Sequence, residues 1–132
     1  MFHRSLFKTY LLAFIILVLC LLPSSSLPKV EQDSFAFDKL VHFLMYVPLA
    51  WTMVFGFKLQ TRFPALKRRA LVATIFIASF YGSVVELLQL LLTPDRYADW
   101  FDLLADVLGV LGGIASYKFG RRLILWWNKL WG

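Results

Sequence analysis

Four long apolar stretches, separated by short polar segments, constrain this chain more than any other feature. They run from about Leu6 to Leu22, Phe37 to Phe57, Ala70 to Leu92 and Trp100 to Phe119. Each is close to the roughly 20 apolar residues that an α-helix needs to cross a bilayer. With 60% hydrophobic residues and a mean hydropathy of +0.69, the chain is too apolar for a soluble domain of 132 residues. We therefore predict an all-α, polytopic membrane protein, a bundle of four transmembrane helices with short loops.

The basic residues predict the orientation of this bundle. Eleven of the fourteen Lys and Arg residues flank helix ends on one side, and all eight acidic residues lie on the other side or in its half of the helices. The eleven are Arg4, Lys8, Lys58, Arg62, Lys67, Arg68, Arg69, Lys118, Arg121, Arg122 and Lys129. Because an excess of Lys and Arg marks the cytoplasmic side, both termini should be cytoplasmic. The net charge of +6 is thereby explained without nucleic acid, and we expect a multi-pass protein of the bacterial cytoplasmic membrane.

The chain divides into three predicted parts. Residues 1–36 form an N-terminal transmembrane anchor and an outer linker, residues 37–119 a three-helix core, and residues 120–132 a basic and aromatic tail. The first stretch also resembles a secretory signal peptide, but Pro23 interrupts the place where a small-residue cleavage site would stand. The tail is predicted to lie along the inner leaflet, or alternatively to end the last span as an aromatic anchor.

Ionisable side chains inside the apolar stretches form three clusters at a similar predicted depth. At 1.5 Å per residue, Glu86 lies about 9 Å below the outer end of its helix, and Asp106 lies about 6 to 10 Å below. A carboxylate within a membrane is by default a functional-site hypothesis, because it is costly unless paired or hydrated. We therefore predict one outward-facing polar pocket. Its candidate residues are Asp38, His42, Tyr46, Glu86, Gln89, Arg96, Asp99, Asp102 and Asp106.

Several of these residues also have plainer explanations. Asp38 and Asp99 are each compatible with a charge or cap at a helix N-terminus. His42 and Glu86 are compatible with hydrogen bonds that only hold helices together. Arg96 either neutralises the surrounding carboxylates or meets an anionic ligand, and the sequence slightly favours neutralisation.

Neither a bound metal nor another cofactor is predicted. One histidine and several carboxylates suit a divalent cation, but the chain has no HExxH motif and no Cys/His pair. The lone Cys20 excludes an intrachain disulfide, and a Gly-x-Ser-x-Gly motif is absent.

Small residues and one proline predict how the helices pack. Gly109 and Gly113 continue the stripe of Asp102 and Asp106, which indicates that this face lies against another helix and not against lipid. Pro48 should kink the second apolar helix below the polar layer.

The ordered polar motifs resemble the VanZ-like family of small bacterial membrane proteins over about residues 37–117. The motifs are Asp38-Lys39-x-x-His42-Phe43-x-x-Tyr46, Tyr81-Gly82-x-x-x-Glu86-x-x-Gln89, Arg96-x-x-Asp99-x-x-Asp102 and Gly109-x-x-x-Gly113. The resemblance implies an integral membrane protein whose type member contributes to low-level teicoplanin resistance. It implies no defined reaction. The family as a rule has asparagine where this chain has Asp106.

Three functions are compatible with this pattern. The favoured one is non-enzymatic: an envelope protein whose outer pocket binds an anionic lipid, a lipid-linked precursor or a glycopeptide, with His42, Glu86 and Arg96 as main contacts. The second is an enzyme acting on such a lipid, with Glu86 or Asp106 as general base and His42 as its partner. The third is an ion-coupled transporter, which the apolar inner halves of the helices disfavour.

Overall fold

The computed structural model describes residues 2–26, 34–94 and 99–131, and within these ranges the chain forms helices and no strands. This confirms the all-α prediction. The elements are α1 (Phe2–Ser5), α2 (Phe7–Leu21), the 3₁₀ turn η1 (Ser24–Ser26), α3 (Ser34–Leu59), α4 (Pro64–Arg68), α5 (Ala70–Leu92) and α6 (Trp100–Trp131). The short α4 lies within the segment predicted as a polar turn, where Pro64 takes the first helical position that suits its fixed φ.

Within the described part of the chain, three helices are long and apolar enough to cross a membrane. They cover Phe35–Leu59, Ala70–Leu92 and Trp100–Leu130. The second, third and fourth predicted spans are therefore present as helices, and α6 continues well past the predicted end at Phe119. The helix α2 is apolar but has 15 residues, fewer than the roughly 20 of a full span. A fourth crossing therefore stays a prediction.

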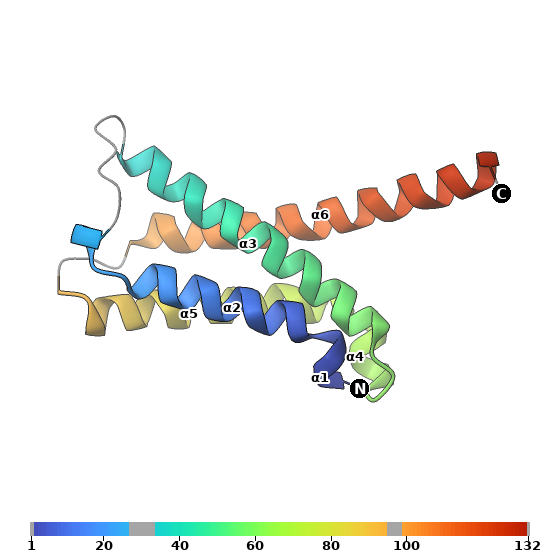
Figure 1. Ribbon diagram of the computed structural model, residues 1–132, viewed down its shortest axis with the longest axis horizontal. Coiled ribbons are helices and arrows are strands. Elements are labelled where there is room, and N and C mark those ends of the chain that lie inside the picture. Colours follow the sequence, from blue (N-terminus) through green and yellow to red (C-terminus); the bar gives the residue numbers. More distant parts are fainter. Residues whose placement is uncertain (1, 27–33, 95–98, 132) are drawn as a thin grey trace.

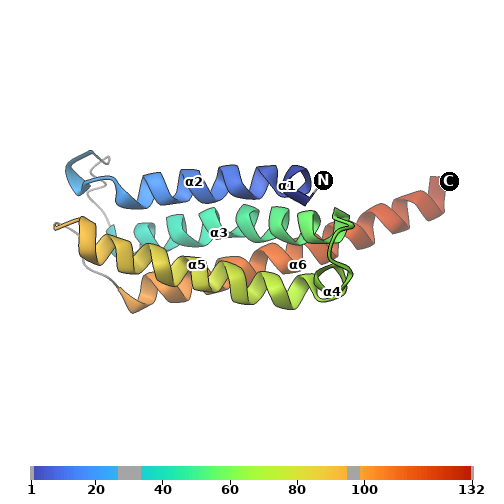
Figure 2. The ribbon, with the colours of Figure 1, turned by 90° about the horizontal axis from the view of Figure 1, so that it is seen from below.

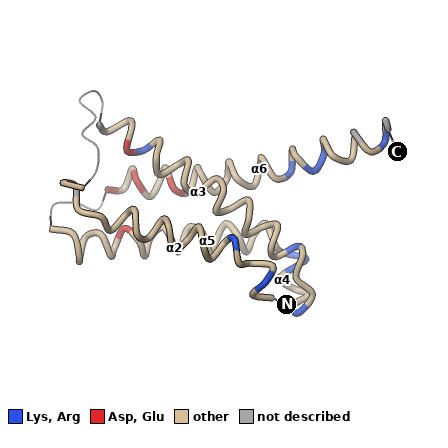
Figure 3. The backbone as a smooth tube through the Cα atoms, in the orientation of Figure 1, with Lys and Arg blue, Asp and Glu red and all other residues tan. Residues whose placement is uncertain are grey.

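The helices lie side by side in a bundle, with α6 extending beyond it (Figures 1 and 2). The N-terminus and α4 lie at one end, and the start of α3, the end of α5 and the start of α6 lie together at the other. Basic residues gather toward the end that holds α4 and along the projecting part of α6, while the acidic residues lie at the opposite end (Figure 3). The separation of charge that the sequence predicted is therefore a property of the folded bundle.

Glycines allow α3 and α6 to cross closely. A Cβ atom at Gly109 would lie 2.5 Å from the Phe43 carbonyl oxygen, and one at Gly113 would lie 2.8 Å from the Ala50 Cβ. Both glycines thus face α3, as the predicted stripe requires. Below the polar layer, fully buried apolar side chains fill the space between the helices: Leu49, Ala50, Val54, Ala78 and Val110.

Two side chains of α5 hold α2 against the bundle. The Tyr81 hydroxyl donates a hydrogen bond to the Ala13 carbonyl, and the Gln89 amide nitrogen donates one to the Cys20 carbonyl over 2.7 Å. Donors that would otherwise be unpaired in an apolar environment therefore bind the backbone of α2.

The outer surface of the bundle is strongly apolar. Phe76, Phe80 and Trp100 are 70%, 71% and 84% exposed. Large exposed apolar surfaces mark an interaction with a partner or a membrane. Together with the three long apolar helices, they identify a membrane protein.

Candidate functional site

The acidic end of the bundle brings polar residues of α3, α5 and α6 together. Asp38, Lys39, His42 and Tyr46 occupy successive turns at the start of α3. Asp102 and Asp106 occupy the first turns of α6, and Glu86 faces them from α5. Residues from all three predicted clusters therefore lie together at this end of the bundle.

Lys39 forms the first part of the site, an ion-pair network near its rim. Its ammonium nitrogen lies 2.8 Å from Asp99 Oδ2 and 3.5 Å from Asp38 Oδ2, and it also forms an ion pair with the Asp102 carboxylate. The hydrogen bond from Lys39 holds the pKa of Asp99, which precedes α6, below its ordinary value. Lys39 therefore joins the beginning of α3 to the beginning of α6.

Lys39 was not among the predicted pocket residues, and the role it performs was predicted for Arg96. Arg96 lies outside the described residues. The signal for Lys39 was present in the sequence: it stands between Asp38 and His42, on the predicted outer side, to which only three basic residues were assigned.

His42 and Asp106 form the buried part of the site. His42 Nδ1 lies 2.8 Å from Asp106 Oδ1 and 3.9 Å from Glu86 Oε1. All three residues are buried: His42 is 3% exposed, Asp106 0% and Glu86 6%. When Asp106 is ionised, the Nδ1–H group of His42 donates to it, so one imidazole lies between two carboxylates.

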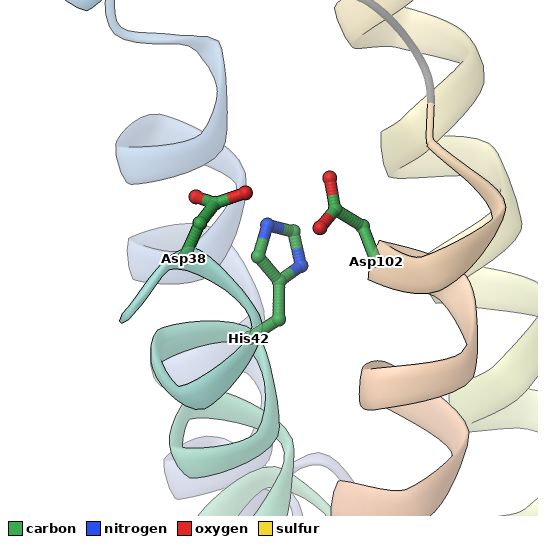
Figure 4. A group of neighbouring side chains, drawn as sticks. All are labelled: Asp38, His42 and Asp102. Carbon is green, nitrogen blue, oxygen red and sulfur yellow. The ribbon is translucent and has the colours of Figure 1, made fainter. Parts of the chain in front are cut away.

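The carboxylates of Asp38 and Asp102 also lie beside the His42 imidazole (Figure 4). Asp38 belongs to α3 and Asp102 to α6, and each offers an oxygen within 4.8 Å of the nearest ring nitrogen. The His42 side chain is therefore common to two groups, one with Asp38 and Asp102 and one with Glu86 and Asp106. Each group has donor atoms of the kinds that bind a divalent cation.

Several buried oxygens of the second group and of the neighbouring Tyr46 have no hydrogen-bond partner among the described residues. They are both carboxylate oxygens of Glu86, Asp106 Oδ2 and the Tyr46 hydroxyl. A buried polar group without a partner typically costs roughly 1–3 kcal/mol, and a charged one more. The centre of the site is thus polar, enclosed and incompletely satisfied.

Gly82 allows α5 to approach this centre. A Cβ atom at Gly82 would lie 3.0 Å from Asp106 Oδ2 and 3.3 Å from the Tyr46 hydroxyl. The glycine thus places the Glu86 turn of α5 against α3 and α6. Gln89 was predicted to line the pocket, but its amide is bound to α2 instead.

A cavity of about 430 Å³ opens beside Glu86, between α5 and α6. Most of its wall is apolar, and Glu86, Asp99 and Ser83 supply the polar part. Its lining residues are Ser83, Glu86, Leu87, Leu90, Asp99, Trp100 and Leu103. Because Leu87, Leu90 and Trp100 are also exposed on the outer surface, the cavity is continuous with the face that would meet lipid.

The chain matches the family model described as VanZ/LLP1 over residues 7–125. This match covers most of the chain and confirms the resemblance found in the polar motifs. No curated protein and no solved structure matches the chain.

Proposed function

Because the chain belongs to the VanZ/LLP1 family, we propose that it binds the polar end of an anionic lipid or lipid-linked envelope precursor in its outer cavity. One observation carries this proposal. The cavity joins leucine and tryptophan side chains on the lipid-facing surface to the carboxylates of Glu86 and Asp99. A ligand that fills it must therefore have an apolar part and a polar part.

The orientation belongs to the same proposal. Lys and Arg residues gather at the end of the bundle that holds α4, and the cluster of carboxylates lies at the other end. By the positive-inside rule, the cavity faces outward and both termini lie in the cytoplasm of a bacterial cell. A role in envelope synthesis or in resistance to a glycopeptide follows if the ligand is a precursor that such an antibiotic recognises.

Lipid retention tests the proposal through a matched pair of variants. Leu87 lines the cavity, and Leu91, one turn further along the exposed surface of α5, does not. Leu87→Trp should fill the cavity and remove the lipid that co-purifies with the wild type, measured by native mass spectrometry. Leu91→Trp should retain it. Equal retention by both variants, or no retained lipid in the wild type, would contradict the proposal.

A second candidate function is an enzyme that acts on the same lipid. The distance of 2.8 Å between His42 and Asp106, with Glu86 at 3.9 Å, favours it, because an oriented imidazole between carboxylates suits acid–base chemistry. Conversion of a bound lipid by the purified wild type but not by His42→Gln would support the enzyme. Retention of an unchanged lipid supports binding alone.

A further inference from the structure

We propose that His42, Glu86 and Asp106 bind a divalent transition-metal ion, with Zn²⁺ or Mn²⁺ as the best fit. The three side chains come from α3, α5 and α6, and their donor atoms lie within 4.8 Å of one another. A tetrahedral ion with bonds of about 2.0–2.1 Å holds its donor atoms about 3.3 Å apart. The distances of 2.8 Å and 3.9 Å from His42 Nδ1 to the Asp106 and Glu86 oxygens bracket this value.

The surroundings of the Glu86 carboxylate indicate independently that a ligand belongs at this site. It is 6% exposed, and neither of its carboxylate oxygens has a hydrogen-bond partner among the described residues. Asp106 Oδ2, on a fully buried residue, also lacks one there. Two neighbouring buried carboxylates repel each other when ionised, and a cation between them would satisfy both.

The neighbouring group of Asp38, His42 and Asp102 fits an ion less well. Lys39 already forms ion pairs with both of those aspartates, so an ammonium group occupies the place of a counter-ion. Among the described residues, Glu86 and Asp106 form no ion pair with a Lys or Arg, and the basic side chain beside them is that of His42 itself. The ion is therefore assigned to the deeper group.

The donor set selects the kind of ion. One imidazole nitrogen and two carboxylate oxygens suit Zn²⁺ and Mn²⁺ better than Ca²⁺ or Mg²⁺, which prefer sets made of oxygen alone. Three protein ligands leave at least one position open on the ion. Glu86 also lines the cavity between α5 and α6, so that position lies close to it.

The ion would also explain how an acidic site accepts an anionic headgroup, a step that rests on the proposed function. The described part of the site contains five carboxylates, those of Asp38, Glu86, Asp99, Asp102 and Asp106. Lys39 neutralises part of this charge at the rim. A divalent cation at the inner end would give the cavity a positive group that a phosphate can bind.

Metal binding by the purified, delipidated protein tests the proposal without any lipid. The wild type is treated with chelator, dialysed, and titrated in detergent with ZnCl₂ and with MnCl₂ by isothermal calorimetry, with MgCl₂ for comparison. We expect about one Zn²⁺ or Mn²⁺ per chain, and a rise in the melting temperature that depends on the concentration of the ion. Weak binding no tighter than that of MgCl₂ would overturn the proposal.

Matched variants locate the ion. His42→Gln and Glu86→Gln should each weaken binding by more than the roughly 10- to 100-fold caused by loss of an outer-shell partner. Asp106→Asn removes a charge but keeps a carbonyl oxygen, so it should weaken binding by about tenfold. The other histidine is the control: His3 lies on α1 at the basic end, and His3→Gln should bind like the wild type.

Two results would place the ion elsewhere and overturn the assignment. One is loss of binding in His3→Gln. The other is loss of metal binding in Asp38→Asn together with full binding in Glu86→Gln, which would assign the ion to the neighbouring group.

Glu86→Gln keeps the size of the side chain and removes a buried charge, so the variant should fold, and its melting curve without metal checks this. If Zn²⁺ binds as expected while Leu87→Trp retains lipid, the metal site stands and the lipid proposal fails.

Discussion

The ammonium group of Lys39 lies 2.8 Å from Asp99 Oδ2, and this ion pair joins the first turns of α3 to the residue that precedes α6. The same ammonium group pairs with Asp102, whose side chain is 8% exposed. Lys39 thus holds together two helices that also carry His42 and Asp106. The position of the buried part of the site depends on this contact near the rim.

Removal of Lys39 should destabilise the bundle. Lys39→Met leaves Asp102 largely buried without a counter-ion. Breaking a fully buried ion pair costs roughly 3–5 kcal/mol, and because Lys39 is partly exposed we expect about 2 kcal/mol. The measurement is thermal or denaturant unfolding in detergent.

A double variant provides the control for this prediction. Lys39→Met combined with Asp102→Asn removes both charges and should recover much of the lost stability, because the two residues are coupled. If the effects of the two substitutions on the free energy of unfolding are additive, the ion pair between Lys39 and Asp102 contributes nothing to stability.

Acid should weaken the contact between Lys39 and Asp99. The pKa of Asp99 is held below its ordinary value of 3.8, so its carboxylate binds protons less readily in the folded state than in the unfolded state. Its contribution to stability is therefore fully present above pH 3.8 and is lost as the pH falls through the lower, folded-state pKa. Unfolding of the wild type and of Asp99→Asn should thus differ at neutral pH and converge in stronger acid. The same comparison in the Lys39→Met background should show a smaller difference, because only the hydrogen bond from the Phe101 amide to Asp99 Oδ1 then remains. An undiminished difference would assign the effect to that amide and not to Lys39.

Two glycines of α6 should respond to the same substitution with opposite signs. A Cβ atom at Gly113 would lie 2.8 Å from the Ala50 Cβ and 3.2 Å from the Trp51 amide nitrogen, whereas one at Gly120 would have no atom within 4 Å. Gly113→Ala should destabilise the bundle by about 1–3 kcal/mol through overpacking. Gly120→Ala should stabilise α6 by up to about 1 kcal/mol, because alanine favours the helix. Equal effects on the melting temperature would show that the stripe does not pack against α3 in the membrane.

Reporter fusions test the proposed topology. Fusions after Gly132 and within residues 58–69 should report the cytoplasm, and a fusion at Thr93 should report the outside. The reason is the gathering of basic residues toward the end that holds α4. A cytoplasmic signal at Thr93 would reverse the orientation, and the cavity would then face inward.

The sequence predicted the helices well because their hydrophobicity is strong and their ends are clearly marked. The third predicted span, Ala70 to Leu92, coincides with α5. The predicted end of the last span at Phe119 was too early, because no proline stands between Phe119 and Trp131 and α6 continues through Gly120. A change in polarity marks where a helix leaves the apolar region and need not end the helix.

Which polar groups would meet was predicted only in part. A rise of 1.5 Å per residue gives the depth of a side chain, so the shared level of His42, Glu86 and Asp106 followed from the sequence. The rotation of each helix about its axis depends on packing, and the pairing of Lys39 with Asp99 and Asp102 depends on that rotation. For the same reason Gln89 shares a helical face with Glu86 but donates to α2.

The last prediction tests whether His42, Glu86 and Arg96 act as one site, as the sequence suggested. His42 and Glu86 lie 3.9 Å apart and share Asp106, so their substitutions should couple by roughly 0.5–3 kcal/mol in ligand retention. His42→Gln, Glu86→Gln and Arg96→Lys preserve size while changing charge or geometry, and each alone should abolish retention without preventing membrane insertion. The double variants should then be no worse than the single ones. Two results together would contradict this prediction: full ligand retention by Glu86→Gln, and a double variant with His42→Gln whose loss of retention is the sum of the two single losses. His42 and Glu86 would then share a depth in the membrane but not a function.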